Sequence, residues 1–440
     1  MRVHLDFAGM RDEWQVFQRA AHARGVAVAQ DLPQSIAQWI GAQKSLEQLQ
    51  RDRNQNSTWM KQQAARASQE DREAAIRRGR ELKEAIRQQE EHTEQLYGAL
   101  MQQALVVPNL LHPEVPVGGE DCARLVRLRG VPPDFPFQPR DHLQIGAMCD
   151  LFDFSQAALA TGSRFYYLKN EAVFLEMALL QFAMNTIASR GYTPVSTPDL
   201  VRRPLLEGCG FQPRGHASQV YNIENSDLCL SGTAEVPLAG MVCNQILEGP
   251  NTPLKLGGIS HCFRVETTHG GEMNRGLYRV HQFSKAEMFI VCSPEESDGL
   301  LEGLRDIEEH IFDSLGLHFR VLDMPSQDLG APAYRKYDME AWLPGMGRWG
   351  EVSSCSNCTD YQSRRLGIRV RPKGEGVVYA HTLNGTALAV PRAIIAILET
   401  HQQEDGSVVV PEILHPYLPP TCRVIRPKDH ASKSTPQSFL

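Results

Sequence analysis

The segment from Phe263 to Phe289 concentrates ionisable and aromatic side chains at spacings that suit nucleotide chemistry. If residues 259–266 form a strand, Arg264 and Glu266 lie on one face of it, since side chains alternate with a period of two. An arginine fork binds phosphate or carboxylate, and a carboxylate accepts from amines and hydroxyls. The first strand therefore offers two groups that a nucleotide site needs.

A second strand over residues 277–292 would place Phe283, Lys285 and Glu287 on one face as well. An aromatic ring there could stack on a purine. The turn between the two strands contains Gly270, Gly271 and Gly276. The alternative is a surface hairpin whose charges are only solvated, and spacing alone favours neither.

Composition sets wider limits on function. The chain has 440 residues, 42% of them hydrophobic and 22% charged, which is typical of globular proteins with two or three domains. A net charge of −7 argues against a generally basic protein that coats nucleic acid. No run of eighteen apolar residues occurs, so we predict neither a membrane-spanning helix nor a membrane partner.

Ten cysteines are scattered along the chain, which indicates free thiols in a reducing compartment. Cys355 and Cys358 form the one CxxC pair. Because no second pair or suitably spaced histidine pair follows, we expect no zinc.

A change of composition near Pro108 divides the chain. Before it, residues 34–63 and 69–105 are rich in Gln, Glu, Arg, Lys and Ala and carry thin apolar stripes at helical spacing. They predict two antiparallel helices forming a coiled-coil hairpin in an arm over residues 1–108, with Ser68 as an N-cap. Such an arm is either a device for reaching a partner or a dimerisation coiled coil.

After Pro108, short apolar runs and frequent Gly and Pro predict an α+β domain over residues 109–427, built on a mainly antiparallel β-sheet flanked by helices. The polar tail over 428–440 is expected to be disordered. The helices are predicted at 170–190, 234–246, 294–315 and 391–400, and further strands at 193–195, 318–322, 337–342 and 349–354.

Three polar clusters lie outside the hairpin. Residues 233–235 (Thr-Ala-Glu) open a predicted helix, residues 351–354 (Glu-Val-Ser-Ser) end a strand, and residues 384–386 (Asn-Gly-Thr) lead into the last helix, which carries Arg392. Each could be a cap or a turn. The G-x-G-x-x-G match at 345–350 neither follows a strand nor opens a helix, so we interpret it as a loop between strands.

The clusters and the hairpin together resemble the seryl-tRNA synthetases, a family of class II aminoacyl-tRNA synthetases. The resemblance extends over nearly the whole chain and includes VPNLLHPEVPVG, SGTAEVPL, GLYRVHQFSKAEMF, GEVSSCSNCTDYQSRR and LNGTALAVPRAIIAILETHQQEDGSVVVPEIL. The three class signatures are matched by residues 191–198, 263–266 and 387–392. The first of these is the family's dimer-interface motif, so the resemblance implies a homodimer.

The family implies a role for each matched residue. Arg264 is expected to hold the α-phosphate of ATP and Glu266 the adenine amine, with adenine between Phe283 and Arg392. Glu351 and Ser354 would hold Mg²⁺ with ATP, as hard oxygen ligands. The expected ATP-binding set is Arg264, Val265, Glu266, Val280, Phe283, Glu351, Val352, Ser353, Ser354 and Arg392.

L-serine is expected to bind through its ammonium to Thr233 and Glu235 and through its hydroxyl to Glu287 and Thr386. The full expected serine set is Thr233, Ala234, Glu235, Arg264, Glu287, Asn384 and Thr386. The implied reaction forms seryl-adenylate and pyrophosphate and then transfers serine to the 3′ end of tRNA(Ser), and by extension tRNA(Sec). No protein nucleophile is implied, so Arg264 and Arg392 would act electrostatically.

Three departures from the bacterial and cytosolic pattern stand out: Val265 and Thr386 replace serines, and Pro391 replaces a glycine. The run AYRKYDMEAWLPGMGRWGEVSS and the AVPR ending resemble the animal mitochondrial branch. The resemblance therefore implies the mitochondrial matrix, whereas the first thirty residues do not look like a transit peptide, which leaves the cytoplasm as the alternative.

Two other functions are alternatives to this one. A threonine or proline enzyme of the same class would carry a sizeable domain after the last motif, and only about forty residues follow Thr400. A non-catalytic paralogue acting as an interaction or RNA-binding protein would be favoured by loss of the key charged residues. Arg264, Glu266, Glu287, Glu351 and Arg392 are all present.

Overall fold

The computed structural model describes residues 3–211, 220–249, 252–266, 275–372 and 376–428. Contacts divide the chain into two compact units, Leu5–Leu110 and Met1–His4 with Leu111–Leu440. Gly270 and Gly271 of the expected turn lie outside the described residues, as does the expected tail from residue 429 onward.

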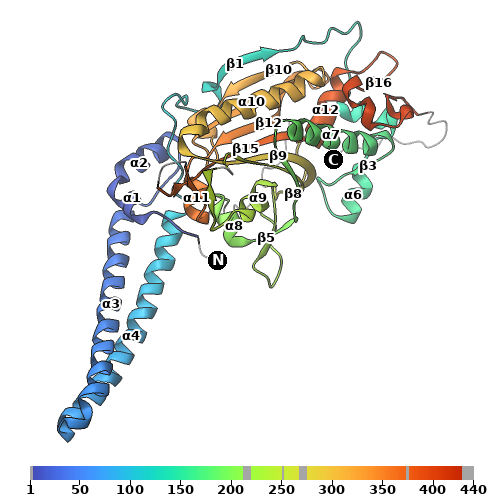
Figure 1. Cartoon of the computed structure of the whole chain (residues 1–440). Coiled ribbons are helices and arrows are strands. Elements are labelled where there is room, and N and C mark those ends of the chain that lie inside the picture. Colours follow the sequence, from blue (N-terminus) through green and yellow to red (C-terminus); the bar gives the residue numbers. More distant parts are fainter. Residues whose placement is uncertain (1–2, 212–219, 250–251, 267–274, 373–375, 429–440) are drawn as a thin grey trace. The chain divides into compact units, whose positions relative to one another are not determined.

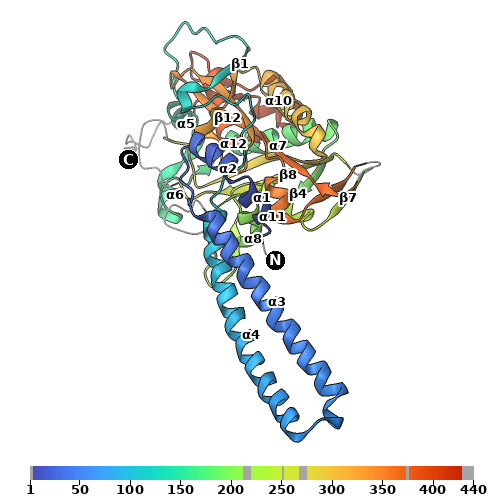
Figure 2. The same cartoon turned by 90° about the vertical axis from the view of Figure 1, so that its left-hand side faces the viewer.

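The smaller unit is dominated by two long antiparallel helices, α3 (Leu32–Gln62) and α4 (Gln69–Ala104), as Figures 1 and 2 show. Both predicted helices are confirmed to within two residues at each end. A short 3₁₀ turn (Ala64–Arg66) joins them, and the Ser68 hydroxyl accepts from the backbone N–H of Asp71 at 3.1 Å. The predicted N-cap therefore begins α4.

Two short helices at one end of the hairpin, α1 (Phe7–Asp12) and α2 (Trp14–Ala23), were not predicted. They complete a small core that contains Met10, Trp14, Leu32, Ile36 and Leu100. The sequence gives little sign of them because each is too short to show a long apolar stripe.

The larger unit is built on an eight-stranded sheet with the order β1-β10-β11-β12-β15-β9-β8-β4. All its pairs are antiparallel except β4 with β8, which confirms a mainly antiparallel sheet. The strands are β1 (Arg124–Arg129), β4 (Thr193–Ser196), β8 (Leu254–Phe263), β9 (Gln282–Cys292), β10 (Phe319–Asp323), β11 (Arg335–Leu343), β12 (Arg348–Asn357) and β15 (His381–Ala389).

Three helices, α7 (Glu171–Ser189), α10 (Ser297–Ser314) and α12 (Val390–Thr400), share one large hydrophobic core with this sheet (Figure 1). Each lies where a helix was predicted. By length and composition alone, α7 could cross a membrane. Its residues Leu175, Leu179 and Ile187 are buried in the core, so packing within the unit accounts for much of its apolar character.

A second core contains residues of α8 (Arg203–Gly208), α9 (Glu235–Met241) and α11 (Tyr361–Leu366) together with Phe289 and Val291 of β9. Smaller strands complete the unit as pairs or as a three-stranded sheet. The remaining elements are α5 (His142–Cys149), β2 (Phe152–Asp153), α6 (Phe154–Ala160), β3 (Tyr167–Leu168), β5 (Leu200–Arg202), α8 (Arg203–Gly208), β6 (Leu228–Leu230), α9 (Glu235–Met241), β7 (Ile246–Glu248), α11 (Tyr361–Leu366), β13 (Arg369–Arg371), β14 (Val378–Tyr379), β16 (Val408–Val409) and β17 (Val424–Ile425).

The predicted hairpin strands were too long toward the turn. β8 ends at Phe263, so Arg264 and Glu266 do not share a strand face. β9 begins at Gln282, whereas residues 277–280 lie in a turn and a bend before it, and Leu277 is fully buried. Gly276 has φ +63°, and a Cβ there would lie 2.4 Å from the His142 ring, so the chain must leave extended geometry at this point.

Two other predicted boundaries were wrong. The helix expected over 234–246 is only Glu235–Met241, and Asn244 with φ +59° follows in the left-handed region. Residues 384–386 lie within β15 rather than in a lead to the last helix, because Gly385 pairs with Met288 of β9 and with Cys355 of β12. The G-x-G segment makes the turn between β11 and β12, although Arg348, Trp349 and Gly350 belong to β12.

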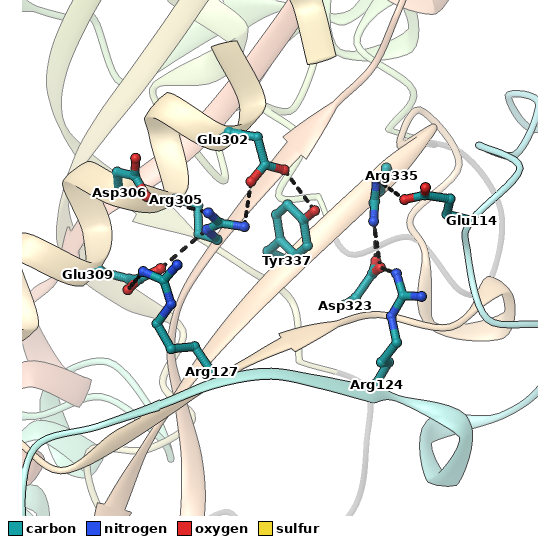
Figure 3. Close-up of polar contacts among 10 residues, drawn as sticks. All are labelled: Glu114, Arg124, Arg127, Glu302, Arg305, Asp306, Glu309, Asp323, Arg335 and Tyr337. Carbon is teal, nitrogen blue, oxygen red and sulfur yellow. Dashed lines mark hydrogen bonds and ion pairs between the residues drawn. The ribbon is translucent and has the colours of Figure 1, made fainter. Parts of the chain in front are cut away.

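Edge strand β1 is joined to the unit by ion pairs (Figure 3). Arg127 and Arg129 both reach the buried Glu309 of α10, at 2.8 and 3.3 Å. Arg305, one turn before Glu309, pairs with the same carboxylate at 3.2 Å. A second centre forms at the fully buried Asp323, which Arg124 and Arg335 contact at 2.5 and 2.8 Å. Two buried carboxylates therefore hold the edge strand.

Replacing Glu309 with Gln should destabilise the larger unit by about 3 kcal/mol, since three arginines would lose a shared buried partner. Chemical denaturation followed by tryptophan fluorescence measures this change. Asp313→Asn is the matched control, because Asp313 pairs with Arg129 at 3.4 Å but its side chain is 39% exposed. A Glu309→Gln loss no larger than the control's would show that the network contributes little.

Candidate active site

One cavity on the larger unit gathers fourteen of the sixteen predicted site residues. It is lined by Thr233, Glu235, Arg264, Glu266, Val280, Phe283, Glu287, Glu351, Val352, Ser353, Ser354, Asn384, Thr386 and Arg392. The other two predicted residues do not line it. Ala234 is fully buried, and Val265 lies in the loop after β8 with its side chain outside the lining.

Strand β9 supplies one row of the cavity wall. Phe283, Lys285 and Glu287 alternate along it and all line the cavity, as the predicted period of two requires. Glu287 pairs across the sheet with Thr386 of β15 on one side and Gly258 of β8 on the other. The sheet register therefore places a carboxylate directly beside a hydroxyl.

Arg264 and Phe283 form one end of the cavity. The Arg264 guanidinium lies 5.2 Å from the centre of the Phe283 ring, and its Nε donates to the carbonyl of Gly232 at 3.3 Å. Glu266 pairs with Arg279 at 3.2 Å. This end presents an arginine and an aromatic face side by side, as expected for an anion and a planar ring.

Arg392, at the start of α12, is held against Glu351 and Tyr278. Its Nη1 donates to the Glu351 carbonyl at 3.0 Å and lies 3.1 Å from the Glu351 carboxylate. Burial disfavours the charged form of Glu351, but Arg392, Lys336 and Arg264 outweigh it and lower the pKa of this carboxyl below its ordinary value. Glu351 is therefore a stable anion that can hold a cation.

The Tyr278 ring is stacked between two arginines, with Arg348 at 4.5 Å and Arg392 at 4.8 Å from its centre. Its hydroxyl accepts from the backbone N–H of Glu351 at 3.0 Å. Gly350 makes room for the ring, since a Cβ there would lie 3.0 Å from it. The tyrosine thus fixes both members of the Arg392–Glu351 pair.

Glu235 lines the cavity beside Thr233 and Asn384 and is 7% exposed. Its Oε1 accepts from Gln362 at 2.5 Å and from Asn384 at 2.9 Å, while Thr382 donates to the Gln362 carbonyl oxygen at 2.7 Å. Burial raises the pKa of Glu235 to about 7, and the two amide donors oppose this rise. An ammonium group bound beside it would favour the carboxylate form.

Glu287 and Lys285 form a buried ion pair next to Glu235, with exposed fractions of 2% and 5%. The Thr233 hydroxyl donates to Glu287 Oε2 at 3.2 Å, and Lys285 donates to the Thr386 hydroxyl at 3.4 Å. This part of the cavity wall therefore carries both charges and hydroxyls close together, as a zwitterionic polar ligand requires.

Glu351 and Ser354 on β12 provide a carboxylate and a hydroxyl, which suit a hard divalent cation that keeps other ligands from water or phosphate. Across the described ranges, no group of three or more His, Cys, Asp or Glu side chains is placed to hold a metal by itself. Cys355 and Cys358 are both buried free thiols, and Asn384 donates to the Cys358 sulfur at 3.6 Å.

Four residues that organise the cavity were not predicted as site residues: Lys285, Tyr278, Arg279 and Gln362. Lys285 had been placed on the right face of the strand but given no role. Gln362 lies within the family-like segment GEVSSCSNCTDYQSRR but was given no role, and its partners Glu235, Thr382 and Cys209 lie 127, 20 and 153 positions away.

Two family models match the chain. Residues 5–111 match the seryl-tRNA synthetase N-terminal domain, and residues 219–401 match the tRNA synthetase class II core domain shared by the G, H, P, S and T enzymes. A serine–tRNA ligase from Treponema denticola is 50% identical over 85% of this chain and 88% of its own. One from Rhodopirellula baltica is 47% identical over 90% and 93%.

Solved structures agree with these relatives. A seryl-tRNA synthetase from Pyrococcus horikoshii, complexed with ATP, superposes with a TM-score of 0.83 at 35% identity and covers 97% of this chain and 100% of its own. A cytoplasmic serine–tRNA ligase from Naegleria fowleri in complex with AMP gives 0.75 at 26% identity, with 98% and 100% covered.

Proposed function

Because the chain belongs to the seryl-tRNA synthetase family and acts as an ATP-dependent serine–tRNA ligase, we propose that its cavity activates L-serine as the adenylate before transfer to tRNA(Ser). The observation that carries this proposal is the meeting of Arg264, Glu287 and Arg392 in one cavity, although they come from three separate segments. A non-catalytic paralogue would have no need to keep all three there.

The nucleotide occupies the end formed by Arg264, Phe283 and Arg392. Adenine stacks on Phe283 and beneath Arg392, and its amine donates to Glu266, while Arg264 binds the α-phosphate. The Glu266–Arg279 and Arg392–Glu351 pairs hold two of these side chains in place before ATP arrives. Preorganised charges of this kind stabilise the pentavalent phosphorus without rearranging during the reaction.

Magnesium fits the pair Glu351 and Ser354, whose oxygens are the ligands this ion prefers, with phosphate completing its shell. The ion would supply charge neutralisation for the phosphates. Tyr278 holds the backbone of Glu351 while Arg392 lowers its pKa, so the carboxylate stays ionised and oriented. Exchange activity that persists after chelation of divalent ions would rule this assignment out.

Serine occupies the part of the cavity that contains Glu235 and Glu287. Its ammonium binds Glu235 and Thr233, its carboxylate faces Arg264, and its hydroxyl meets Glu287 and Thr386. A serine carboxylate oxygen then attacks the α-phosphorus as the bond to the pyrophosphate oxygen breaks. The tRNA hydroxyl later takes the seryl group and AMP leaves. Chain residues position and neutralise these groups, and no side chain becomes covalently attached.

The purified protein should catalyse serine-dependent ATP–pyrophosphate exchange, and Arg264→Ala should lower kcat/KM by about 10³-fold, the size of effect seen when one transition-state donor is lost. Lys255→Ala on neighbouring β8 is the control, since Lys255 does not line the cavity. Absence of exchange by the folded wild-type chain at saturating serine and ATP would overturn the proposal.

The kcat/KM for serine should fall as the pH drops below about 7, because protonation of Glu235 removes the carboxylate that binds the ammonium. The decline should approach tenfold per pH unit. Exchange assays at saturating ATP give the profile. A Glu235→Gln variant should be weakly active without this decline. If wild-type kcat/KM stays level down to about pH 5.5, Glu235 does not bind the ammonium as an anion.

The helical hairpin is proposed to bind the RNA, through phosphate contacts and shape rather than base sequence. Arg77, Arg78 and Arg80 on α4 supply positive charge on a mixed surface. Replacing all three with Gln should lower kcat/KM for charging tRNA(Ser) by about tenfold or more and leave pyrophosphate exchange unchanged. If the triple variant charges tRNA(Ser) as efficiently as the wild-type chain, the RNA contacts lie elsewhere. The same assay with tRNA(Sec) tests the second acceptor.

A homodimer is proposed through the segment 191–198 and the preceding helix α7. On α7, Val173, Phe174 and Met177 are 38%, 43% and 60% exposed, so an apolar stripe is left on a helix whose other face is buried. A monomeric mass in sedimentation equilibrium would refute the dimer.

The compartment stays a prediction. The mitochondrial matrix is supported only by the sequence resemblance of the AVPR ending and the β11–β12 region, while the relatives reported above include bacterial enzymes. Imaging of the tagged full-length chain decides between the matrix and the cytoplasm.

A further inference from the structure

Lys285 is a buried cation inside the cavity. The proposed binding of ATP and serine assigns no function to it. It is 5% exposed, lines the cavity, and lies on the same face of β9 as Glu287. A lysine is seldom buried to this extent unless it is paired. Its ammonium forms an ion pair with the Glu287 carboxylate and donates to the Thr386 hydroxyl at 3.4 Å.

An ammonium has three donors and no acceptor, so it fixes the direction of every hydrogen bond that it makes. The Thr386 hydroxyl must accept from Lys285, and its own proton therefore points away from the ammonium. Among the described residues, Lys285 is the side chain bonded to this hydroxyl. The proton is left for a ligand in the cavity.

The carboxylate of Glu287 has the opposite character. Its Oε2 accepts from the Thr233 hydroxyl and is paired with Lys285, so the group acts as an acceptor. Because Glu287 and Thr386 are cross-strand neighbours, an acceptor and a donor lie side by side on the cavity wall. A ligand hydroxyl between them could donate to the first and accept from the second.

We propose that Lys285 is a specificity-determining residue. It makes the Thr386 hydroxyl a donor and keeps Glu287 an acceptor, so that a substrate hydroxyl can accept a hydrogen bond from Thr386 and donate one to Glu287. This inference rests on the proposed serine site. An alanine side chain would leave the Thr386 proton without an acceptor and would not supply the additional donor to Glu287. The thiol of cysteine would serve both groups poorly, because S–H is a weak donor and sulfur a weak acceptor.

The other role for Lys285 is purely structural, to neutralise Glu287 within the sheet. The two roles differ in one measurable quantity. A structural role affects all ligands of the site alike, whereas hydroxyl orientation affects only ligands that carry a hydroxyl. Seryl- and alanyl-sulfamoyl adenosine differ by this one hydroxyl, so the ratio of their dissociation constants isolates its contribution.

Isothermal titration with the two analogues should give the wild-type chain a ratio of about 10³ or more in favour of the seryl compound. Lys285→Met should reduce this ratio by about tenfold or more, mainly through weaker seryl binding. Lys255→Met on β8 should leave the ratio unchanged, since that side chain lies outside the cavity lining and contacts the Tyr192 ring. Equal weakening of both analogues would overturn the proposal.

Lys285→Met leaves Glu287 buried without its cation, which threatens folding. A Lys285→Met/Glu287→Gln double variant restores the charge balance, and thermal unfolding confirms that the titrated protein is folded. The double variant should keep the low ratio, and a ratio restored to the wild-type value would overturn the role. If the wild-type chain binds neither analogue, the proposed function itself is rejected, and this result differs from a change in the ratio of the two dissociation constants.

Discussion

The register of β9 between β8 and β15 is the constraint on which the cavity depends. It places Phe283, Lys285 and Glu287 on one face and brings Glu287 opposite Thr386. A slip of one residue would turn all three side chains into the opposite layer. The buried side chains of β9 on the other face, among them Met288 and Ile290, penalise such a slip because they belong to the main core. The packing that stabilises the sheet therefore also orients the side chains that line the cavity.

Several of the charged side chains that line the cavity form ion pairs. Lys285 faces Glu287, Arg392 faces Glu351, and Arg279 faces Glu266. Glu235 differs, since its neighbours Gln362 and Asn384 are neutral and burial raises its pKa to about 7. Among the described residues that line the cavity, Glu235 is the carboxyl held by amide hydrogen bonds instead of an ion pair, and it is the one that the proposal assigns to the ammonium of the substrate. Such a site loses little by binding that group and much by binding an apolar one.

Much of the architecture could be predicted because it follows from local periodicity. The long helices α3 and α4 and strands β11 and β12 show their periods directly in the sequence. The positions where prediction failed are those where tertiary contacts override local preference. Arg264 reaches the cavity from a loop rather than a strand, since β8 ends at Phe263. Tyr278 and Gln362 lie within family-like segments, but their roles could not be assigned because most of their partners are distant in sequence and no motif spacing links them.

The hairpin of α3 and α4 has its buried residues concentrated at one end. In α3 these are Leu32, Ile36 and Ala42, and α4 has none before Leu82. Because the helices are antiparallel, the half nearest the Ala64–Arg66 turn is held mainly by propensity and surface contacts. The local stability of the hairpin therefore decreases toward the Ala64–Arg66 turn. The half nearest this turn should open more often and exchange its amide protons faster than the half that contains the buried residues. Binding of RNA to the half nearest the turn would have to order this part of the hairpin. The affinity for RNA would then depend on the conformational entropy lost by the hairpin as well as on charge.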